Sequence, residues 1–340
     1  MPADPSTSPP PTGNWLEYVR VMRLDHWLKN IFILFGSAVA IALVDVPFTP
    51  QVMALKIVLS LIPACLVASA NYILNEILDA PFDRLHPRKK IRAVAAGTVS
   101  IPVLYGLMAA LNIVALGLCF LFQFNIGYIV SLVLLFLSGL VYNIPPVRLK
   151  DRAYLDVIAE SFNNPIRLWL GWYALCPPTS FPPLSVILAW WSFGALLMTG
   201  KRYAEFRFID DPELSGRYRK SFQVYRNHTL IICMVTYANL FCFCMAAAMT
   251  TYKPNLIFAF PIILIAIIVY FNHAMSEKGA QLEPEQLMKN PLLIAATVAT
   301  MLWGLFLVYT PLDIPKVFHF FQLIPGDAKP SKFIDAPRVR

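Results

Sequence analysis

Four side chains that carry oxygen and lie close together in the sequence could bind a divalent cation: Asn75, Glu76, Asp79 and Asp83. Residues three or four apart share a face of a helix, so Asn75 and Glu76 should both lie next to Asp79. We expect Pro81 to break or bend the chain and let Asp83 turn back toward them. Carboxylate and amide oxygens suit Mg²⁺, which shares its remaining positions with water and substrate phosphates. The alternative is an acidic helix end neutralised by the basic residues that follow.

A basic run begins directly after Asp83 and could hold the anionic part of a substrate. A diphosphate needs a metal ion to bridge its oxygens and Arg or Lys side chains to take the rest of its charge. Alone, such a run could equally anchor the chain to anionic lipid headgroups. The residues expected to contact substrate here are Arg84, His86, Lys89 and Arg92.

A second chemically active segment closes a later apolar stretch, at Gly200-Lys-Arg-Tyr-Ala-Glu205. Lys201 and Glu205 are four apart and share a helical face, whereas Arg202 is expected to point elsewhere. The pair offers a base and an acid to one cavity, although a purely structural salt bridge explains it as well. We expect Lys201 and Glu205 to act with Asp79 and Asp83 in catalysis. The further substrate contacts expected in this part of the chain are Arg202, Tyr203, Arg219 and Lys220.

Polar residues also lie inside an apolar stretch, at intervals that form one helical stripe: Asp156, Glu160, Asn163, Asn164 and Arg167. Ionisable groups within a membrane are costly and usually mark function. We expect Asn164 and Arg167 to bind substrate; buried pairing with other spans is the alternative. Nearer the start of the chain, Lys29 is read as a substrate contact or as part of an interfacial belt with Trp27.

The elements that must position these groups are membrane helices. Hydrophobic residues make up 58% of the 340 residues and charged residues only 14%, which excludes an ordinary soluble domain. Nine apolar runs have the length of a membrane-spanning helix. We expect a lead at 1–14 without a fixed structure, a membrane domain at 15–310 and a tail at 311–340. The predicted spans are 31–46, 53–74, 100–122, 125–143, 153–175, 183–200, 228–250, 255–272 and 291–310.

The net charge of +8 is distributed asymmetrically between the two sides of the predicted bundle. Basic residues gather in the segments on the side of the N-terminus, whereas the loops on the other side contain only Lys253. Positive residues favour the cytoplasmic side of a membrane, so we expect the N-terminus and the chemically active loops in the cytoplasm and the tail outside. The charge therefore does not indicate a nucleic-acid partner.

Several of these segments resemble the UbiA superfamily of intramembrane prenyltransferases, and most closely its decaprenyl-phosphate phosphoribosyltransferase branch. The matching pieces are RLDHWLKN at 23–30, NEILDAPFDRLHPRKKIRAVAAG at 75–97, YNIPPVRLKD at 142–151, GKRYAE at 200–205 and RKS at 219–221. They occur in the family's order and cover nearly the whole chain.

The resemblance implies an all-α, nine-transmembrane-helix bundle of UbiA type in a bacterial inner (plasma) membrane, with a cytosol-facing active-site cavity. It implies Mg²⁺ as cofactor, held by Asn75, Asp79 and Asp83, with Glu76 at the family's first aspartate position. Phosphoribosyl diphosphate would enter from the cytoplasm and a polyprenyl phosphate from the membrane lipids. The alternative is transfer of a prenyl group from prenyl diphosphate to an aromatic or lipid acceptor; the sequence also leaves a homo-oligomer open.

Overall fold

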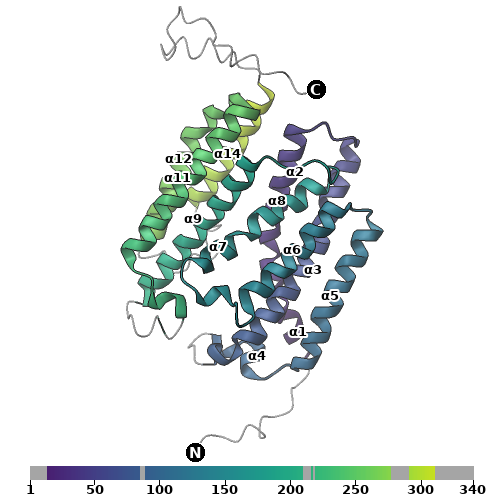
Figure 1. Ribbon diagram of the computed structural model, residues 1–340, viewed down its shortest axis with the longest axis vertical. Coiled ribbons are helices and arrows are strands. Elements are labelled where there is room, and N and C mark those ends of the chain that lie inside the picture. Colours follow the sequence, from purple (N-terminus) through teal and green to yellow (C-terminus); the bar gives the residue numbers. More distant parts are fainter. Residues whose placement is uncertain (1–13, 85–88, 210–215, 217–218, 277–290, 311–340) are drawn as a thin grey trace, which may run out of the picture.

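The chain folds into a bundle of long helices (Figure 1), and the computed structural model describes residues 14–84, 89–209, 216, 219–276 and 291–310. Within this part of the chain, all regular structure is helical. The α-helices are α1 (Trp15–Val21), α2 (Phe32–Leu43), α3 (Pro50–Asp83), α4 (Ala93–Ala96), α5 (Ile101–Leu121), α6 (Ile126–Asn143), α7 (Leu155–Ser161), α8 (Asn163–Tyr173), α9 (Leu184–Ile209), α11 (Asn227–Tyr252), α12 (Phe260–Met275) and α14 (Pro291–Tyr309). The short 3₁₀ segments are η2 (Leu24–Ile31), η3 (Lys89–Ile91), η4 (Leu149–Asp151), η5 (Lys220–Gln223) and η6 (Pro254–Ala259).

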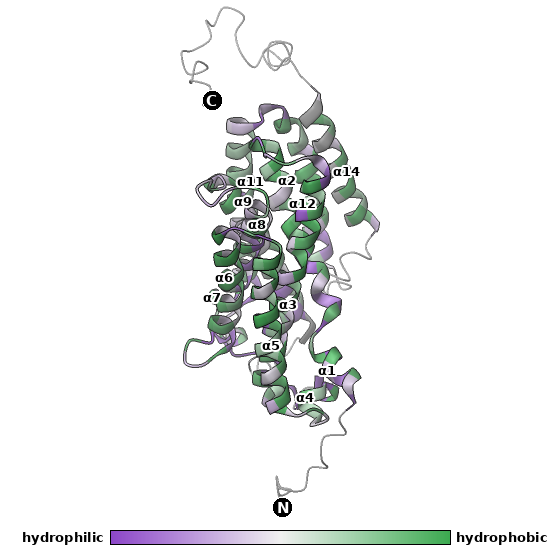
Figure 2. Cartoon of the chain, turned by 90° about the vertical axis from the view of Figure 1, so that its right-hand side faces the viewer, coloured by the Kyte–Doolittle hydropathy of each residue, from purple (hydrophilic) through white to green (hydrophobic). Residues whose placement is uncertain are grey.

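Seven helical stretches in the described part of the chain are long and apolar enough to cross a membrane. They correspond to seven of the nine predicted spans, and Figure 2 shows that hydrophobic residues dominate their length. The stretches are Trp15–Leu43, Pro50–Asp83, Ile101–Leu121, Ile126–Asn143, Leu184–Arg207, Asn227–Tyr252 and Pro254–Met275.

The other two predicted spans take a different form. The span predicted at 153–175 is divided into α7 and α8, with Phe162 between them. Pro165 explains the division, because a proline ring clashes with the carbonyl group four residues earlier, here that of Ser161. The span predicted at 291–310 corresponds to α14, which is a single helix of 19 residues.

Helix α3 is longer than a membrane is thick. Its 34 residues correspond to about 50 Å at 1.5 Å per residue, whereas the hydrocarbon core of a bilayer is about 30 Å. The helix continues through Pro81 as far as Asp83, so the chain does not break at Pro81 as the sequence suggested. The helix is therefore longer than the apolar layer, and the acidic residues lie near its C-terminal end.

The helices pack in two groups joined by α7 and α8 (Figure 1). On one side α3 packs against α5 and α6, and on the other α9 packs along α11. Between the groups, α8 contacts α2, α6 and α9, while α7 contacts α6 and α9. The polar stripe predicted in the fifth span thus lies where the two groups meet.

Glycines let α2 and α8 approach closely. A Cβ atom on Gly36 would lie 2.0 Å from the carbonyl oxygen of Leu168, and one on Gly171 would lie 1.9 Å from that of Ile33. Ser37 Oγ also donates to the carbonyl oxygen of Gly171, at 3.0 Å. Such contacts between small residues are a common way to join helices in membranes. Here they hold α8 against α2.

Different helices meet at the two ends of the bundle. At one end, where α1 lies beside α4 (Figure 1), the Ser100 backbone N–H donates to Tyr18 Oη at 3.0 Å. At the opposite end, Asn255 Nδ2 donates to the carbonyl oxygen of Thr310 at 3.0 Å, next to the end of α14. The acidic end of α3 and the last turns of α9 both lie at the α1 end.

Candidate active site

The acidic residues at the end of α3 each have their own protein partner. Glu76 is buried and accepts a hydrogen bond from the Val94 backbone N–H at 3.4 Å. Asp83 is also buried and pairs with Arg92, with 2.7 Å between Oδ2 and Nη1. The neighbouring Asp79 instead accepts from the loop that follows α6. The three carboxylates therefore lie on one helix end but are separately bound.

Lys150 occupies the centre of this loop contact. Its Nζ donates to Asn143 Oδ1 at 2.9 Å, to Asn75 Oδ1 at 3.2 Å and to Asp79 Oδ1. Burial lowers the pKa of the Lys150 ammonium to about 8, and the attraction of Asp79 acts in the opposite direction. Arg148 Nη2 reaches the same oxygen of Asp79 at 3.1 Å. The site residues Asn143, Arg148 and Lys150 were not predicted, although all three lie in the YNIPPVRLKD segment that carried the family resemblance.

The oxygens around Lys150 fit a cation. Asn75, Asp79 and Asn143 already direct three oxygens at one positively charged atom. No group of three or more His, Cys, Asp or Glu side chains that could hold a metal ion occurs among the described residues. A metal here would thus be held by amide and carboxylate oxygens together, with water and phosphate oxygens completing its coordination, which is a ligand set that suits Mg²⁺.

A second cluster surrounds Asp156, which is fully buried in α7. Its Oδ2 lies 3.0 Å from Arg202 Nε and 3.5 Å from Arg219 Nη1, and Ser221 Oγ donates to it at 3.3 Å. Tyr225 Oη donates to Oδ1 at 2.5 Å. Four groups from α9 and from the segment around η5 therefore converge on one carboxylate. Sequence analysis placed Asp156 on the polar stripe but did not predict its partners.

Arg202 is held on three sides. Besides Asp156, its guanidinium group donates to Glu205 Oε2 at 2.9 Å and to Tyr142 Oη at 3.4 Å. The expectation that Arg202 points away from Glu205 was therefore wrong, because residues three apart on a helix also share a face. Lys201 and Lys89 both act electrostatically on Glu205. Thus Lys89, which follows α3, lies near Glu205, in the last part of α9.

The η4 segment connects the two clusters. Asp151 Oδ2 lies 3.2 Å from Arg148 Nε, which belongs to the α3 cluster. The same oxygen lies 3.6 Å from Nζ of Lys220, a largely exposed residue of η5. The ion pairs therefore run without a gap from Asp79 through Arg148 and Asp151 to Lys220, and the two predicted segments form one charged surface at one end of the bundle.

Arg167 is buried in α8, where its side chain contacts the end of η2. Its Nε donates to Asn30 Oδ1 at 3.0 Å and its Nη1 to the carbonyl oxygen of Asn163 at 3.4 Å. Asn30 in turn donates to Cys65 Sγ at 3.2 Å. Among the described residues, no carboxylate lies within ion-pair distance of Arg167. In the described part of the chain, the Arg167 guanidinium therefore donates its hydrogen bonds to amide and carbonyl oxygens.

The other predicted substrate contacts have varied surroundings. Lys29 lies 6.0 Å from the ring centre of Tyr72, and Arg84 donates to the carbonyl oxygen of Ala95 at 3.2 Å. Asn164 is buried against α9, where a Cβ on Gly194 would meet it at 1.9 Å. Tyr203 belongs to a buried apolar cluster. His86 lies outside the described residues.

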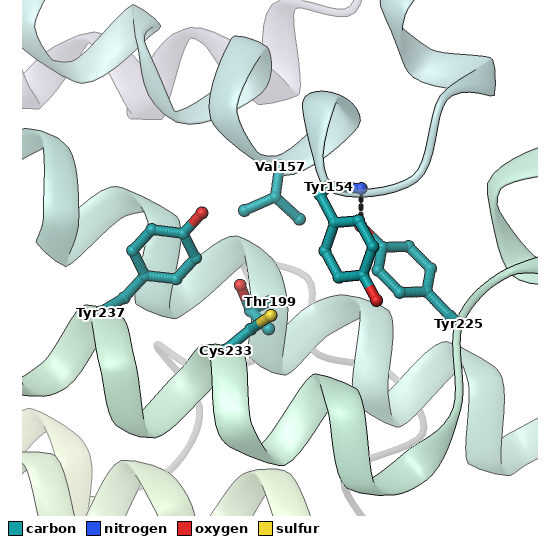
Figure 3. A pocket seen from close by; sticks show the side chains of 6 residues that line it. All are labelled: Tyr154, Val157, Thr199, Tyr225, Cys233 and Tyr237. Atoms are coloured by element: carbon teal, nitrogen blue, oxygen red, sulfur yellow. Dashed lines mark hydrogen bonds between the residues drawn. The ribbon is translucent and has the colours of Figure 1, made fainter.

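A small pocket lies beside the Asp156 cluster, between α7, α9 and α11 (Figure 3). The space between its side chains is too narrow to admit a water molecule. Tyr225 links pocket and cluster, because its hydroxyl binds Asp156 and also accepts from the Tyr154 backbone N–H at 2.8 Å, drawn as a dashed line in Figure 3. The lining residues are Tyr154, Val157, Thr199, Tyr225, Cys233 and Tyr237.

Comparison of the sequence with known proteins gives consistent matches. The model of the UbiA prenyltransferase family matches residues 31–295. Decaprenyl-phosphate phosphoribosyltransferase of Mycolicibacterium smegmatis is 28% identical over 225 residues, which are 66% of this chain and 67% of that protein. The protein of the same name from Corynebacterium glutamicum is 27% identical over 219 residues, 61% of this chain and 59% of that protein.

Solved structures match the fold over most of the chain. A UbiA homologue from Archaeoglobus fulgidus bound to DMAPP and Mg²⁺ has a TM-score of 0.63 at 15% identity, covering 87% of this chain and 100% of that one. The apo structure of a UbiA homologue from Aeropyrum pernix K1 has a TM-score of 0.59 at 15% identity, covering 82% and 99%. At these identities the likeness establishes the fold alone.

Proposed function

The chain belongs to the UbiA prenyltransferase family, and on that premise we propose that it transfers a 5-phosphoribosyl group from phosphoribosyl diphosphate to a polyprenyl phosphate, with Mg²⁺ as cofactor. The observation that carries the proposal is the continuous charged surface at one end of the bundle, where cation-binding oxygens on α3 lie next to Arg and Lys side chains from other segments. The similarity to decaprenyl-phosphate phosphoribosyltransferases supports the choice of donor and acceptor.

The proposed reaction requires stabilisation of negative charge more than it requires proton transfer. An oxygen of the lipid phosphate attacks C1 of the ribose, the bond from C1 to the diphosphate oxygen breaks, and its electron pair leaves with the diphosphate. The attacking phosphate is already an anion at pH 7, so no strong base is needed. When bound, Mg²⁺ would neutralise charge on the diphosphate. The chain would contribute positioning and fixed positive charge.

We assign the residues as follows. Asn75 and Asp79 hold the metal, with Glu76 and Asp83 on the same helix end as further ligands after release from Val94 and Arg92. Lys201 and Glu205 act with them in catalysis. Donor-binding basic groups are Arg84, Lys89, Arg92, Arg202, Arg219 and Lys220. We further propose that Arg167, in the bundle interior, binds the phosphate of the lipid.

We also place the charged end of the bundle at the cytoplasmic face of a bacterial inner membrane. The distribution of basic residues supports this orientation, because the segments between helices at this end contain most of them. A soluble, highly charged donor would then reach the site from the cytoplasm.

A two-label assay tests the proposal. Purified protein in liposomes that contain polyprenyl phosphate receives either phosphoribosyl diphosphate labelled in the ribose or a labelled prenyl diphosphate with an aromatic acceptor. We expect ribose label to enter the lipid fraction only in the presence of Mg²⁺, and the Asp79→Asn variant to lose this transfer. Transfer of the prenyl label instead would establish the alternative reaction and contradict our assignment of the donor.

A further inference from the structure

The ammonium group of Lys150 lies where the proposed metal would lie. It donates to the oxygens of Asn75 and Asp79, the two residues of α3 whose oxygens converge, and to Asn143. An ammonium group has three N–H donors, and all three are used here. Only 6% of the Lys150 side chain is exposed. The protein therefore supplies its own cation to the oxygens that a metal requires.

A divalent cation and this ammonium cannot share the site as it stands. Both need the same lone pairs on Asn75 and Asp79, and two positive charges a few ångströms apart repel strongly where water is scarce. Arg148 adds a further positive charge at Asp79, 3.1 Å from the same oxygen. Mg²⁺ by itself would have to displace Lys150 from all three of its acceptors.

A diphosphate changes this balance. It brings several anionic oxygens, which can accept the hydrogen bonds of a displaced ammonium and at the same time coordinate the metal. The flexible four-carbon arm of lysine lets Nζ move while its backbone stays in η4. The segment itself remains fixed, because Asp151 is paired with Arg148 and Lys220.

We propose that Lys150 occupies the cation site of the free protein, so that Mg²⁺ binds only together with a diphosphate. As the metal enters, the diphosphate oxygens accept the hydrogen bonds of the displaced ammonium. The inference rests on the proposed function only in its use of a diphosphate donor, and it applies equally to phosphoribosyl diphosphate and to prenyl diphosphate. Its consequence is ordered binding: metal affinity is low in the empty protein and rises when the donor is present.

Calorimetric titration of the full-length protein with Mg²⁺, without donor, tests the proposal. We expect weak binding by the wild type and binding at least about tenfold tighter by Lys150→Met, because the competing charge is gone. Lys150→Arg retains a positive charge and should bind as weakly as the wild type. Lys253→Met, at the opposite end of the bundle, is the matched control and should equal the wild type.

Inorganic pyrophosphate then serves as the probe for the second half of the proposal. It should raise the Mg²⁺ affinity of the wild type by more than it raises that of Lys150→Met. Equal Mg²⁺ affinity of the wild type and Lys150→Met without pyrophosphate would overturn the inference and leave the proposed transfer reaction standing. If Asp79→Asn bound Mg²⁺ and pyrophosphate as tightly as the wild type does, both the inference and the proposed metal site would fall.

Discussion

Asp156 and Arg202 form a buried ion pair, 3.0 Å from Oδ2 to Nε, that joins α7 to α9. Their side chains are 0% and 4% exposed, so neither charge is compensated by water. Arg219 and Tyr225 bind the same carboxylate from the segment that follows α9. The pair thus links the divided fifth span to α9 and to the segment that follows α9.

Removal of the carboxylate should destabilise the protein strongly. Asp156→Ala removes one of the two carboxylates bound to Arg202 and the acceptor that Arg219, Ser221 and Tyr225 share. Breaking a buried pair in this way costs about 3–5 kcal/mol. Equilibrium unfolding in mixed micelles measures the change. Lys220→Ala, which removes the exposed pair with Asp151, serves as control and should cost at most about 1 kcal/mol. Equal losses for the two variants would show that the Asp156 pair is not a structural centre.

Tyr225→Phe should alter the pH dependence of stability. Burial, and secondarily Asp156, raise the pKa of the Tyr225 hydroxyl well above its ordinary range. Above about pH 10 the unfolded chain therefore loses this proton before the folded chain does. Stability contributed by the hydroxyl is present below that pH and is lost as the pH rises. The free energy of unfolding measured from pH 8 to 11 should fall less steeply in Tyr225→Phe; an unchanged slope would refute the assignment.

Close packing of α2 on α8 should not tolerate an added methyl group. Gly171→Ala places a Cβ 1.9 Å from the Ile33 carbonyl oxygen, so the helices must separate. Overpacking of this kind costs about 1–3 kcal/mol. Gly117 lies in α5, where an added Cβ would meet nothing within 4 Å, so Gly117→Ala should be neutral or slightly stabilising. Matching unfolding curves for the two variants would argue against the tight contact.

Arg167 should govern affinity for the anionic lipid and leave donor binding unaffected. The group lies in the bundle interior between Asn30 and Asn163. Arg167→Met removes the charge and should raise KM for polyprenyl phosphate by about tenfold or more, in line with the loss of a charge-assisted hydrogen bond. Arg167→Lys should restore part of the loss. A larger effect on KM for phosphoribosyl diphosphate would place Arg167 in the donor site instead.

Much of the membrane architecture was predictable because apolar length is a strong signal. Seven of the nine predicted spans correspond to helices of sufficient length, and the acidic motif lies at a helix end as expected. The fifth span was harder to predict, because Pro165 divides an apolar run that hydropathy alone treats as continuous. Hydropathy also did not reveal how far α3 extends past the membrane.

The charged surface was only partly predictable. Glu76 and Asp79 were found from their spacing along one helix, and Asp83 was grouped with them on the expectation that the chain breaks or bends at Pro81. The partner of Asp79, Lys150, lies 71 residues away in sequence. Contacts of that kind depend on how helices pack, which spacing rules do not cover. The same limitation explains why Asp156 was recognised as a polar residue within an apolar stretch, while Ser221 and Tyr225 were not recognised as its partners.

Replacement of Asp79 by cysteine tests most directly whether Asp79 is a metal ligand for the proposed transfer. A thiolate binds soft ions such as Cd²⁺ far better than it binds Mg²⁺. Transfer of ribose label to lipid by Asp79→Cys should therefore fall by about a hundredfold or more with Mg²⁺ and recover in part with Cd²⁺, while Glu17→Cys, which removes an ion pair in α1, keeps its dependence on Mg²⁺. Full activity of Asp79→Cys with Mg²⁺, or no recovery with any thiophilic ion, would contradict the account.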